Sequence, residues 1–428
     1  MSEWKEYKLG EISDDVSYGY TASADAKQVG PKFLRITDIR NDFIDWDSVP
    51  YCKIGTRDYA KNKLEHGDIV IARTGATTGI SEIIKHDVDA VFASYLIRFR
   101  INKQVANPFY VSYILKSKLW ENYVSGIISG SAQPGANAKQ FSDFSLKVPS
   151  IETQNVIAEI LSSLDDKIEL NNQINANLEA LARAIFKHWF IDFEFPDENG
   201  NPYKSSGGKM IESELGEIPE AWNIGCLDSV VEFSNGYAFK SMELLDKDIG
   251  NCFHVFKMGH IKKGGGFNSE STKSFYERGK ATKIQKYILK TGDLLMCMTD
   301  MKGNVALLGH TALMNESAKY IVNQRVGLLR ANNALCIDYP YLYILTNSTD
   351  FIQELRSRAN SGVQVNLSTS EIKSTKIIIP EKQINMAFDQ LSKTFFEKIF
   401  FLTRENNSLI KLRNLLLPKL ISGQISIE

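Results

Sequence analysis

The sequence is poor in the residues that build metal sites and disulfide frameworks. Its five cysteines are scattered along the chain and none forms a C-x-x-C pair: Cys52, Cys226, Cys252, Cys297 and Cys336. The six histidines are dispersed as well, with no pair at metal-ligand spacing. We therefore expect neither a metal site nor a disulfide framework, and we expect the reducing cytoplasm as the compartment.

Long apolar runs are also missing. No stretch approaches the roughly 18 apolar residues of a membrane span. The first residues, MSEWKEYKLGEIS, lack the apolar centre of a signal peptide. We therefore expect no membrane partner. A hydrophobic content of 43% and a charged content of 24% are ordinary for a globular protein, and 428 residues suffice for two or three domains.

The chain has no excess of charge of either sign, since its formal net charge is −1. Acidic residues outnumber basic ones between residues 151 and 220, whereas residues 221–380 are basic and residues 1–150 nearly neutral. Nucleic-acid affinity depends on cationic contacts to phosphates. If this chain binds nucleic acid, we expect it to share those contacts with a basic partner.

Catalytic signatures are absent or incomplete. Asn107-Pro108-Phe109-Tyr110 is similar to the Asn-Pro-Pro-Phe/Tyr motif of amino-methyltransferases, but the second proline and a glycine-rich loop for the methyl donor are missing. Gly264-Gly265-Gly266 lacks the Gly-Lys-Ser/Thr of a phosphate loop. We interpret the first as a helix cap and the second as a flexible turn, and we expect a non-catalytic chain that binds no cofactor of its own.

What the sequence does contain is an internal repeat. Residues 4–193 and 222–428 align, with Trp4 on Trp222 and Leu64-Glu65-His66-Gly67-Asp68 on Leu289-Lys290-Thr291-Gly292-Asp293. A period of this length is far beyond the roughly 20 to 50 residues of solenoid repeats. It predicts two copies of one domain-plus-helix module. Two similar faces in one chain suit a target that can be read twice, and duplex DNA is the leading candidate.

Each copy begins with a strand-rich segment and a short helix. Apolar or alternating runs occur at 33–36, 68–73 and 96–100 and again at 254–257, 293–298 and 325–330. Pro108 and Pro340 then open short helices, because proline suits the first helical turn. We predict an α+β fold with a first domain (1–150), a central long helix (151–193), a linker (194–220), a second domain (221–380) and a C-terminal long helix (381–428).

The two long helices carry apolar residues at alternating steps of three and four, which is the heptad spacing of coiled coils. Asn175 and Asn406 occupy equivalent positions, where a buried asparagine fixes the register of a helix pair. We predict that the helices pair with each other; the alternative is that each lies on its own domain. The predicted seam consists of Leu164, Ile168, Asn175, Leu178, Ile185, Phe395, Ile399, Asn406, Leu409 and Leu416.

Short motifs around the linker and at the end of the chain carry a resemblance to a known family. They are DFEFPDENG at 192–200, SSGGKM at 205–210, SELGEIPEAW at 213–222 and LPKLISG at 417–423. Together with the repeated Gly-Asp strands, the Gln133 and Gln364 segments, and Thr153-Gln154 and Lys382-Gln383 at the helix starts, their order resembles the DNA specificity (S) subunit of type I restriction–modification enzymes.

The resemblance implies a specific architecture and set of partners. It implies two tandem α/β target-recognition domains, separated by two long helices that pair as an antiparallel coiled coil with internal pseudo-twofold symmetry. Each domain would read one half of a split site in double-stranded DNA. Two methyltransferase (modification) subunits would bind the helices, and restriction subunits would join through them. S-adenosylmethionine would then belong to the methyltransferase, and ATP and Mg to the restriction subunit.

Polar residues that follow the early strands are the candidates for DNA contacts. Arginine in a Gly/Thr-rich loop can read guanine, and Asn and Gln suit adenine edges, while Lys262-Lys263 favours phosphate. The first-domain candidates are Arg35, Thr37, Asp38, Arg40, Arg73, Thr74, Thr77, Gln133, Asn137 and Lys139; those of the second are Lys257, His260, Lys262, Lys263, Thr299, Lys302, Asn304, Gln364 and Asn366. The alternative for each is a solvated polar turn.

The two copies differ at these candidate positions while they agree at scaffold positions, so we predict two different half-sites. Other functions stay open at this point. The chain could be the specificity subunit of a related enzyme that cuts beside its site. A coiled-coil scaffold without DNA function is the alternative from a different class, and a stand-alone methyltransferase is disfavoured by the missing donor loop.

Overall fold

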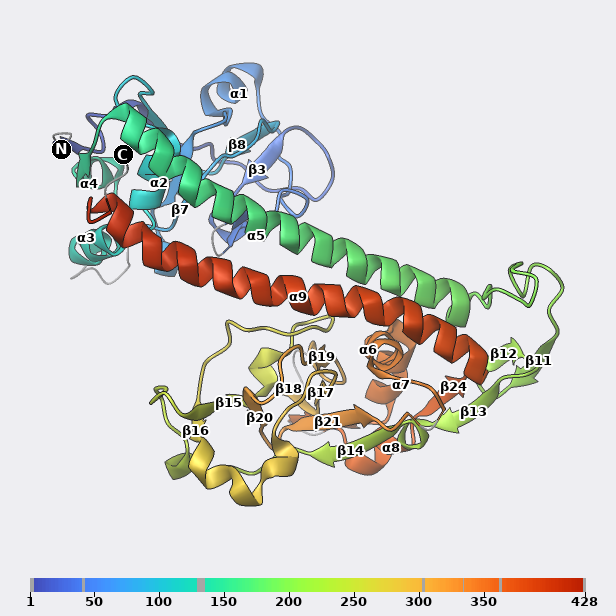
Figure 1. Cartoon of the computed structure of the whole chain (residues 1–428). Coiled ribbons are helices and arrows are strands. Elements are labelled where there is room, and N and C mark those ends of the chain that lie inside the picture. The colour runs from blue at the N-terminus through green and yellow to red at the C-terminus, as the bar shows by residue number, and fades with distance from the viewer. Residues whose placement is uncertain are drawn as a thin grey trace. The chain divides into compact units, whose positions relative to one another are not determined.

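The structure is a computed structural model that describes residues 4–40, 43–128, 135–301, 305–333, 335–361 and 364–425. The chain divides into two compact units (Figure 1). The first unit contains Met1–Leu170 and Glu405–Glu428, and the second contains Asn171–Arg404. The first unit is therefore built from both ends of the chain, and each long helix contributes to both units.

The first unit contains an antiparallel sheet in the order β2-β9-β6-β7. Its strands are β2 (Ser13–Tyr18), β9 (Leu96–Ile101), β6 (Ile69–Ala72) and β7 (Ser81–Ile83). Beside it lie a parallel pair, β3 (Lys32–Leu34) with β8 (Ala90–Phe92), and two antiparallel pairs, β1 (Lys5–Lys8) with β10 (Ser145–Val148) and β4 (Ile39–Arg40) with β5 (Phe43–Ile44). All of β6 is buried, as expected for a central strand with an uninterrupted apolar sequence.

The short helices of the first unit are α1 (Thr56–Asn62), α2 (Pro108–Ile114), α3 (Lys118–Ile128) and α4 (Ala138–Ser142). Asn107 caps α2, because its Oδ1 accepts hydrogen bonds from the backbone N–H of Phe109 at 2.8 Å and of Tyr110 at 3.3 Å. The helix-cap interpretation of the Asn-Pro-Phe-Tyr motif is therefore confirmed. Asp338 is the cap residue of the corresponding helix of the second unit, and its side chain accepts from the N–H of the next residue, Tyr339, at 2.7 Å.

The second unit repeats this topology, which confirms the internal repeat. Its sheet has the order β14-β21-β17-β19, made of β14 (Val231–Asn235), β21 (Val326–Ala331), β17 (Leu294–Cys297) and β19 (Thr311–Leu313). The parallel pair recurs as β15 (Cys252–Phe256) with β20 (Tyr320–Val322), and β13 (Asn223–Cys226) pairs with β24 (Lys376–Ile379). The helices α6 (Tyr339–Thr346), α7 (Thr349–Ser357) and α8 (Thr369–Lys373) follow in the same order as α2 to α4.

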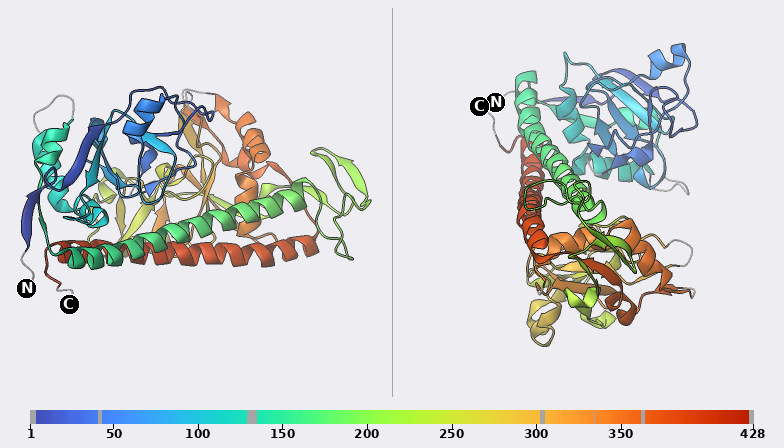
Figure 2. Two further views of the ribbon diagram at one scale, coloured as in Figure 1. Left: turned by 90° about the horizontal axis from the view of Figure 1, so that it is seen from above. Right: turned by 90° about the vertical axis from the view of Figure 1, so that its right-hand side faces the viewer.

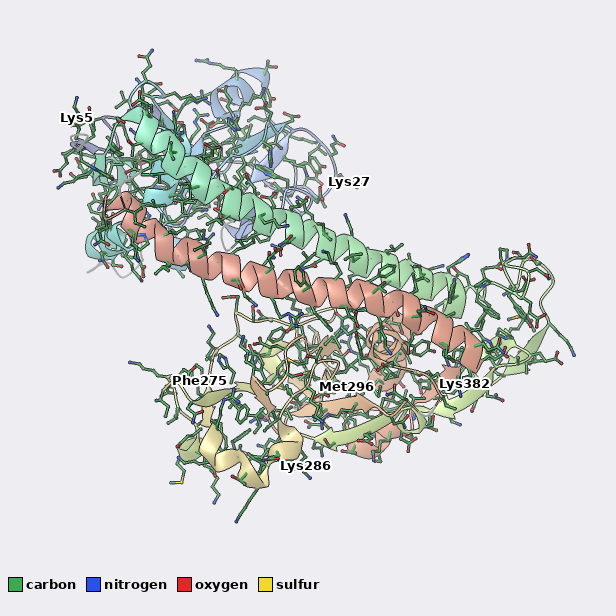
Figure 3. The ribbon with its side chains drawn as sticks, in the orientation of Figure 1. Lys5, Lys27, Phe275, Lys286, Met296 and Lys382 are labelled. Carbon is green, nitrogen blue, oxygen red and sulfur yellow. The ribbon has the colours of Figure 1, made fainter. Side chains whose placement is uncertain are left out.

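The second unit adds strands that have no counterpart among the described residues of the first. β16 (Phe275–Glu277) extends the parallel pair, and β18 (Thr299–Met301), β23 (Gln364–Asn366) and β22 (Asn360–Ser361) form a small sheet. Core and surface separate as expected. Met296 of β17 is buried, whereas the side chains of Lys27 and Lys286 lie at the surface of their units (Figure 3).

The segment expected to be a linker, 194–220, is packed against the second unit. It contains a hairpin of β11 (Met210–Ser213) and β12 (Gly216–Pro219). Phe195 stacks on Trp222 with ring centroids 5.0 Å apart, and both lie in the core together with Ile218. The Pro- and Gly-rich composition of this segment thus specifies turns, while its aromatic residues fix it to the domain.

The glycine run 264–266 forms a turn, as predicted. All three glycines have positive φ, between 82° and 101°. A Cβ on Gly265 would lie 2.4 Å from Oδ1 of Asn347, and the N–H of Gly266 donates to the carbonyl of Thr311 at 2.9 Å. Glycine is required here because of the backbone conformation and the close approach of Asn347.

The long helices are α5 (Ile151–Phe186), which continues as a π-helical turn over Lys187–Ile191, and α9 (Lys382–Ile421). In the first unit, Asp165 of α5 binds Arg413 of α9 at 2.7 Å, and the backbone oxygen of Ile168 accepts from Nδ2 of Asn406 at 3.5 Å. In the second unit, Phe186 packs on Phe388 with centroids 5.9 Å apart. Residue numbers rise on one helix as they fall on the other, so the helices are antiparallel (Figures 1 and 2).

The helices therefore pair with each other, and the alternative in which each lies only on its own domain is wrong. Every predicted seam residue is buried or half-buried: Leu164, Ile168, Asn175, Leu178, Ile185, Phe395, Ile399, Asn406, Leu409 and Leu416. Each helix also packs on a domain, since Leu161 and Leu420 belong to the core of the first unit, and Ala182 and Phe396 to that of the second. Among the described residues, no helix has the length and apolarity needed to cross a membrane.

Candidate DNA interface

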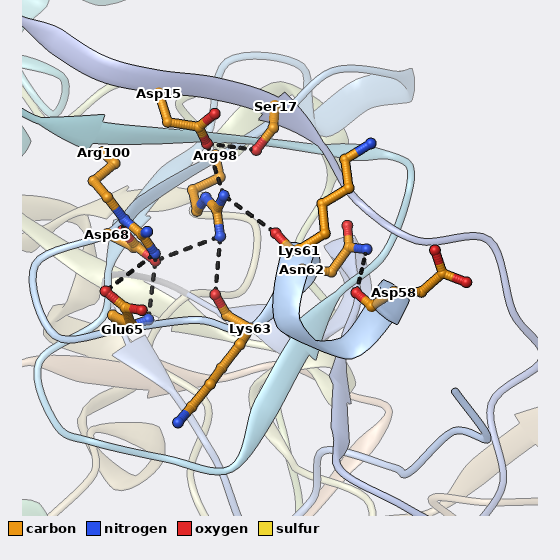
Figure 4. Close-up of polar contacts among 10 residues, drawn as sticks. All are labelled: Asp15, Ser17, Asp58, Lys61, Asn62, Lys63, Glu65, Asp68, Arg98 and Arg100. Carbon is orange, nitrogen blue, oxygen red and sulfur yellow. Dashed lines mark hydrogen bonds and ion pairs between the residues drawn. The ribbon is translucent and has the colours of Figure 1, made fainter. Parts of the chain in front are cut away.

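In both copies the aspartate of the Gly-Asp motif binds an arginine at the start of the central strand, and we call this pair the Asp–Arg lock. The carboxylate of Asp68 accepts from the backbone N–H of Glu65 at 2.9 Å and from two nitrogens of Arg100 at 2.8 and 3.0 Å (Figure 4). Asp293 accepts from Lys290 at 2.8 Å and from Arg330 at 2.8 and 2.9 Å. Bidentate arginine–carboxylate pairs fix geometry, so this lock fixes the start of β6 to β9 and the start of β17 to β21.

A second buried arginine strengthens the lock in the first domain only. Arg98 donates to Asp15 at 2.7 Å and to the backbone oxygen of Lys63 at 2.9 Å, and its Nη1 lies 3.9 Å from Asp68 (Figure 4). The strand registers place Leu328 at the equivalent position of the second domain. The two copies thus share the Asp–Arg pair, but a second arginine lies beside it in the first domain and a leucine in the second.

The parallel strands β3 and β8 end at the candidate reading surface of the first domain. Beyond their carboxyl ends, Leu34 and Phe92, lies a hollow of about 350 Å³. Its lining includes Tyr20, Arg35, Thr37, Ser94 and Tyr95. The carboxyl ends of parallel strands are a general location for binding sites in α/β sheets. Two predicted contact residues, Arg35 and Thr37, therefore line this hollow.

Arg73 is held beside the hollow by two contacts. Its Nε donates to the backbone oxygen of Ser94 at 3.0 Å, and its guanidinium lies over the ring of Tyr18, 5.1 Å from the centroid. Among the described residues, its terminal nitrogens Nη1 and Nη2 have no hydrogen-bond partner. The side chain is thus restrained while its terminal donors have no partner among the described residues, and bidentate base recognition needs two such donors.

The third predicted segment meets the same surface. The N–H of Ala136 donates to the backbone oxygen of Arg73 at 2.9 Å, and Thr74 forms a β-bridge with Gly135. The N–H of Ala138 donates to the Tyr18 hydroxyl at 2.9 Å. The structure therefore brings together the segments around residues 35, 73 and 137, which are far apart in the sequence.

Some first-domain candidates also have structural roles. Asp38 is buried and accepts from the backbone N–H, Nε and Nη2 of Arg35 at 2.8 to 3.0 Å. Asn137 caps α4 by accepting from Gln140. Thr37 and Lys139 are exposed, and Thr74 and Thr77 are half-buried. Arg40 is described in its backbone only, and Gln133 lies outside the described residues.

In the second domain, Lys257 and His260 take the places of Arg35 and Asp38 around the turn that follows the parallel strand. His260 is only 2% exposed, and its Nδ1 accepts from the N–H of Lys257 at 3.1 Å. Burial lowers the pKa of His260, so the ring is neutral at pH 7. Lys257 Nζ donates to Ser274 Oγ at 2.6 Å. His260 is therefore a structural residue rather than an accessible DNA contact.

The other second-domain candidates lie on two loops. Thr299 pairs with Asn366 between β18 and β23, and its hydroxyl lies 2.8 Å from the sulfur of Met258. Asn366, Lys262 and Lys263 are exposed. The two lysines precede the glycine turn, which packs on β19 and α6. Gln364 is described in its backbone only, and Lys302 and Asn304 lie outside the described residues.

Comparisons with known proteins identify the family. A family model described as the type I restriction modification DNA specificity domain matches residues 1–180 and 219–409. The chain belongs to this family. The two matched regions correspond to the two copies of the repeat, and together they cover most of the sequence.

Curated relatives of this specificity chain are similar along most of their length. The specificity subunit of the type I restriction enzyme HindI of Haemophilus influenzae is 27% identical, over 99% of this chain and 100% of that protein. The MjaIX specificity subunit of Methanocaldococcus jannaschii is 26% identical over 74% of this chain and 69% of its own. The crystal structure of a type I S subunit from M. genitalium has the same fold, with a TM-score of 0.57, 13% identity and coverage of 98% and 96%.

Sequence reasoning missed several residues of the specificity chain. Tyr18, Ser94 and Tyr95 restrain Arg73 or line the hollow, yet no motif marks them. Arg100 and Arg330 complete the Asp–Arg lock, and their identical place in the aligned strands could have revealed them. Within the described part of the chain, no group of three His, Cys, Asp or Glu side chains could hold a metal ion.

Proposed function

We propose that this specificity subunit reads a bipartite, asymmetric DNA site and directs partner methyltransferase and restriction subunits to it, without catalysing a reaction itself. The observation that carries the proposal is the duplicated domain whose scaffold is constant and whose candidate reading side chains differ. The same sheet order and the same Asp–Arg lock occur in both units. Arg73 and Thr74 of the first domain correspond to Met298 and Thr299 of the second.

Each domain reads one half-site through side chains at the carboxyl ends of its parallel strands. Arg73 presents its terminal nitrogens to a guanine edge, and Thr74 and Thr77 lie in the same loop. Exposed cations such as Lys139, Lys262 and Lys263 contact phosphates and fix the register on the duplex. The half-buried Arg35 and exposed Thr37 contribute from the rim of the hollow.

The partners supply the chemistry and part of the affinity. Two methyltransferase subunits bind the α5–α9 helix pair and carry S-adenosylmethionine; restriction subunits with ATP and Mg join through them. A net charge of −1 limits the phosphate contacts that this chain makes alone. The helix pair sets the number of unread base pairs between half-sites. The family match does not favour the alternative enzyme that cuts beside its site or the coiled-coil scaffold.

A binding selection tests this proposal. The chain, its modification subunit and their mixture are each incubated with a random duplex DNA library at several salt concentrations, and the bound fragments are sequenced. We expect the mixture to enrich one motif with two defined halves and an undefined spacer, and its affinity to fall steeply with salt. The chain alone should bind weakly. A mixture that binds without enriching any motif would contradict a reading function.

A further inference from the structure

The turn between β8 and β9 of the first domain is held in place by backbone hydrogen bonds. The N–H of Leu96 donates to the carbonyl of Ala93 at 2.8 Å, and the N–H of Ser94 donates to that of Tyr20 at 2.9 Å. The N–H of Arg73 donates to the carbonyl of Tyr95 at 3.0 Å. The end of β6 and the tip of this turn are therefore fixed to each other.

The turn between β20 and β21 of the second domain is held in the same way. Val326 donates to the carbonyl of Asn323 at 3.0 Å, and Gln324 donates to that of Tyr237 at 2.9 Å. The N–H of Met298 donates to the carbonyl of Arg325 at 3.4 Å. These matching hydrogen bonds make Arg325 the structural equivalent of Tyr95, and Met298 the equivalent of Arg73.

Each domain thus has an arginine in this region, but on a different one of the two bonded segments. In the first domain the arginine is on the β6 side, and the turn presents Tyr95, which is 58% exposed. In the second domain Met298 is only 7% exposed and cannot reach a DNA groove, whereas Arg325 is exposed. Among the described residues, the Arg325 side chain has no hydrogen-bond or ion-pair partner.

The residues at the ends of β2 and β14, Tyr18 and Asn235, are equivalent and make comparable contacts. In the first domain, Tyr18 beside Arg73 accepts from the N–H of Ala138. In the second, Asn235 at the end of β14 accepts from the hydroxyl of Thr369 at 3.1 Å. The start of α4 in the first domain and the start of α8 in the second therefore contact equivalent strand ends.

We propose that Arg325 is the base-reading arginine of the second domain and that it forms hydrogen bonds to the edge of a guanine in the second half-site. The inference rests on the proposed function and names a residue that determines its specificity. Arginine reads guanine through two parallel hydrogen bonds to O6 and N7 in the major groove. The fixed backbone of the β20–β21 turn holds the start of the side chain, and the absence of a partner among the described residues leaves its donors available. The exposed Gln324 lies next to it.

The test is the methylation motif of hosts that express the complete system with substitutions in this chain. R325A should relax one guanine position of the second half-site by roughly tenfold in base preference and leave the first half-site unchanged. R325K keeps the charge but loses the planar fork, so it should relax the same position. R73A should relax a position of the first half-site only. K283A, at an exposed lysine of the second domain, should leave the motif unchanged.

The outcomes separate the residue assignment from the proposed function. An unchanged motif with R325A overturns the assignment, because a base-reading side chain cannot be removed without a change in preference. A uniform loss of methylation with R325A that R325K restores also overturns it, because a phosphate contact needs only the charge. If the unsubstituted system yields no bipartite motif, the proposed function fails, whatever Arg325 does. Arg325 is exposed, so these substitutions leave the core intact.

Discussion

Single buried carboxylates in this protein differ in how well their charge is compensated. Asp68 and Asp293 are buried against bidentate arginines. Asp389 of α9 is also buried, but its nearest cation, Lys393, lies 3.9 Å away and binds Asp338 at 2.6 Å instead. One Asp389 oxygen has no hydrogen-bond partner within the described residues. Burial therefore raises the pKa of Asp389 to about 7, and the charge of Asp338 adds to this.

The stability of the second unit should depend on pH through Asp389. The pKa of an aspartate in the unfolded chain is about 4, so the folded state binds the proton more tightly between pH 4 and 7. Stability should therefore fall as the pH rises through that range. At pH 8 the Asp389→Asn variant should be more stable than the unsubstituted protein by about 1 to 2 kcal/mol, less than the full linkage value because Lys393 is close.

Urea unfolding at pH 5 and pH 8, followed for both proteins, measures this effect. Glu397, an exposed acid on the same helix, provides the matched control, and Glu397→Gln should leave the pH dependence unchanged. Equal responses of the Asp389→Asn variant and the control to pH would show that Asp389 does not titrate in this range.

The residues that the sequence could identify are those that a repeat or a local motif marks. Arg73 follows a recognisable strand within a Gly/Thr-rich loop, and the structure places it at the surface with two donors available. Burial depends on distant segments, so the sequence could not show that His260 lies in the core beside Phe267. Arg325 was hidden for the same reason, because its equivalence to the Arg73 surface exists only in the strand pairing.

At the level of elements, the heptad pattern predicted the helix pair because the spacing of apolar residues fixes one face of a helix. The antiparallel direction was expected from the family resemblance and not from a local pattern, because it depends on contacts such as that of Asp165 with Arg413. The π-helical turn at Lys187–Ile191 was not predicted. It is followed by Phe193 with φ 61°, and the aromatic packing of Phe190 and Trp222 accompanies this change of direction.

The anchor between the first domain and the helix pair is a buried polar cluster. Asp165 of α5 binds Arg413 of α9 at 2.7 Å and accepts from the hydroxyl of Tyr113 of α2 at 2.7 Å. The side chains of Arg413 and Asp165 are 14% and 10% exposed. In the second domain Tyr343 takes the place of Tyr113 and donates to Glu179 of α5 at 3.2 Å.

Removal of the cation from this cluster should destabilise the first unit. Arg413→Ala leaves a buried carboxylate whose remaining hydrogen-bond donor among the described residues is the Tyr113 hydroxyl, which should cost about 3 kcal/mol of unfolding free energy. Lys411→Ala, at an exposed position on the same helix, should change stability by less than about 0.5 kcal/mol. Urea denaturation of the three proteins measures the difference. Similar midpoints for the two variants would mean that the cluster does not anchor the helices.

At the scale of the whole molecule, the two copies share the contacts that stabilise the domain and differ in the side chains that are candidates for DNA contact. The Asp–Arg lock and the sheet order are the same in both copies, and in each a capping side chain precedes the helix after the sheet. Three equivalent positions differ: Tyr18 against Asn235, Arg73 against the buried Met298, and Tyr95 against Arg325. Because base edges are read by side chains, two domains with different side chains at equivalent places should select different sequences.

The recognised DNA should therefore be an asymmetric, bipartite motif, which long-read detection of methylated bases can establish in a host that expresses the complete system. We expect two unlike half-sites at a constant spacing, and no such methylation in a host that lacks only this chain. A chain in which residues 221–380 are replaced by the equivalent residues of the first domain has identical reading surfaces, so its motif should become symmetric. A palindromic motif from the unsubstituted system would contradict the link between surface divergence and specificity.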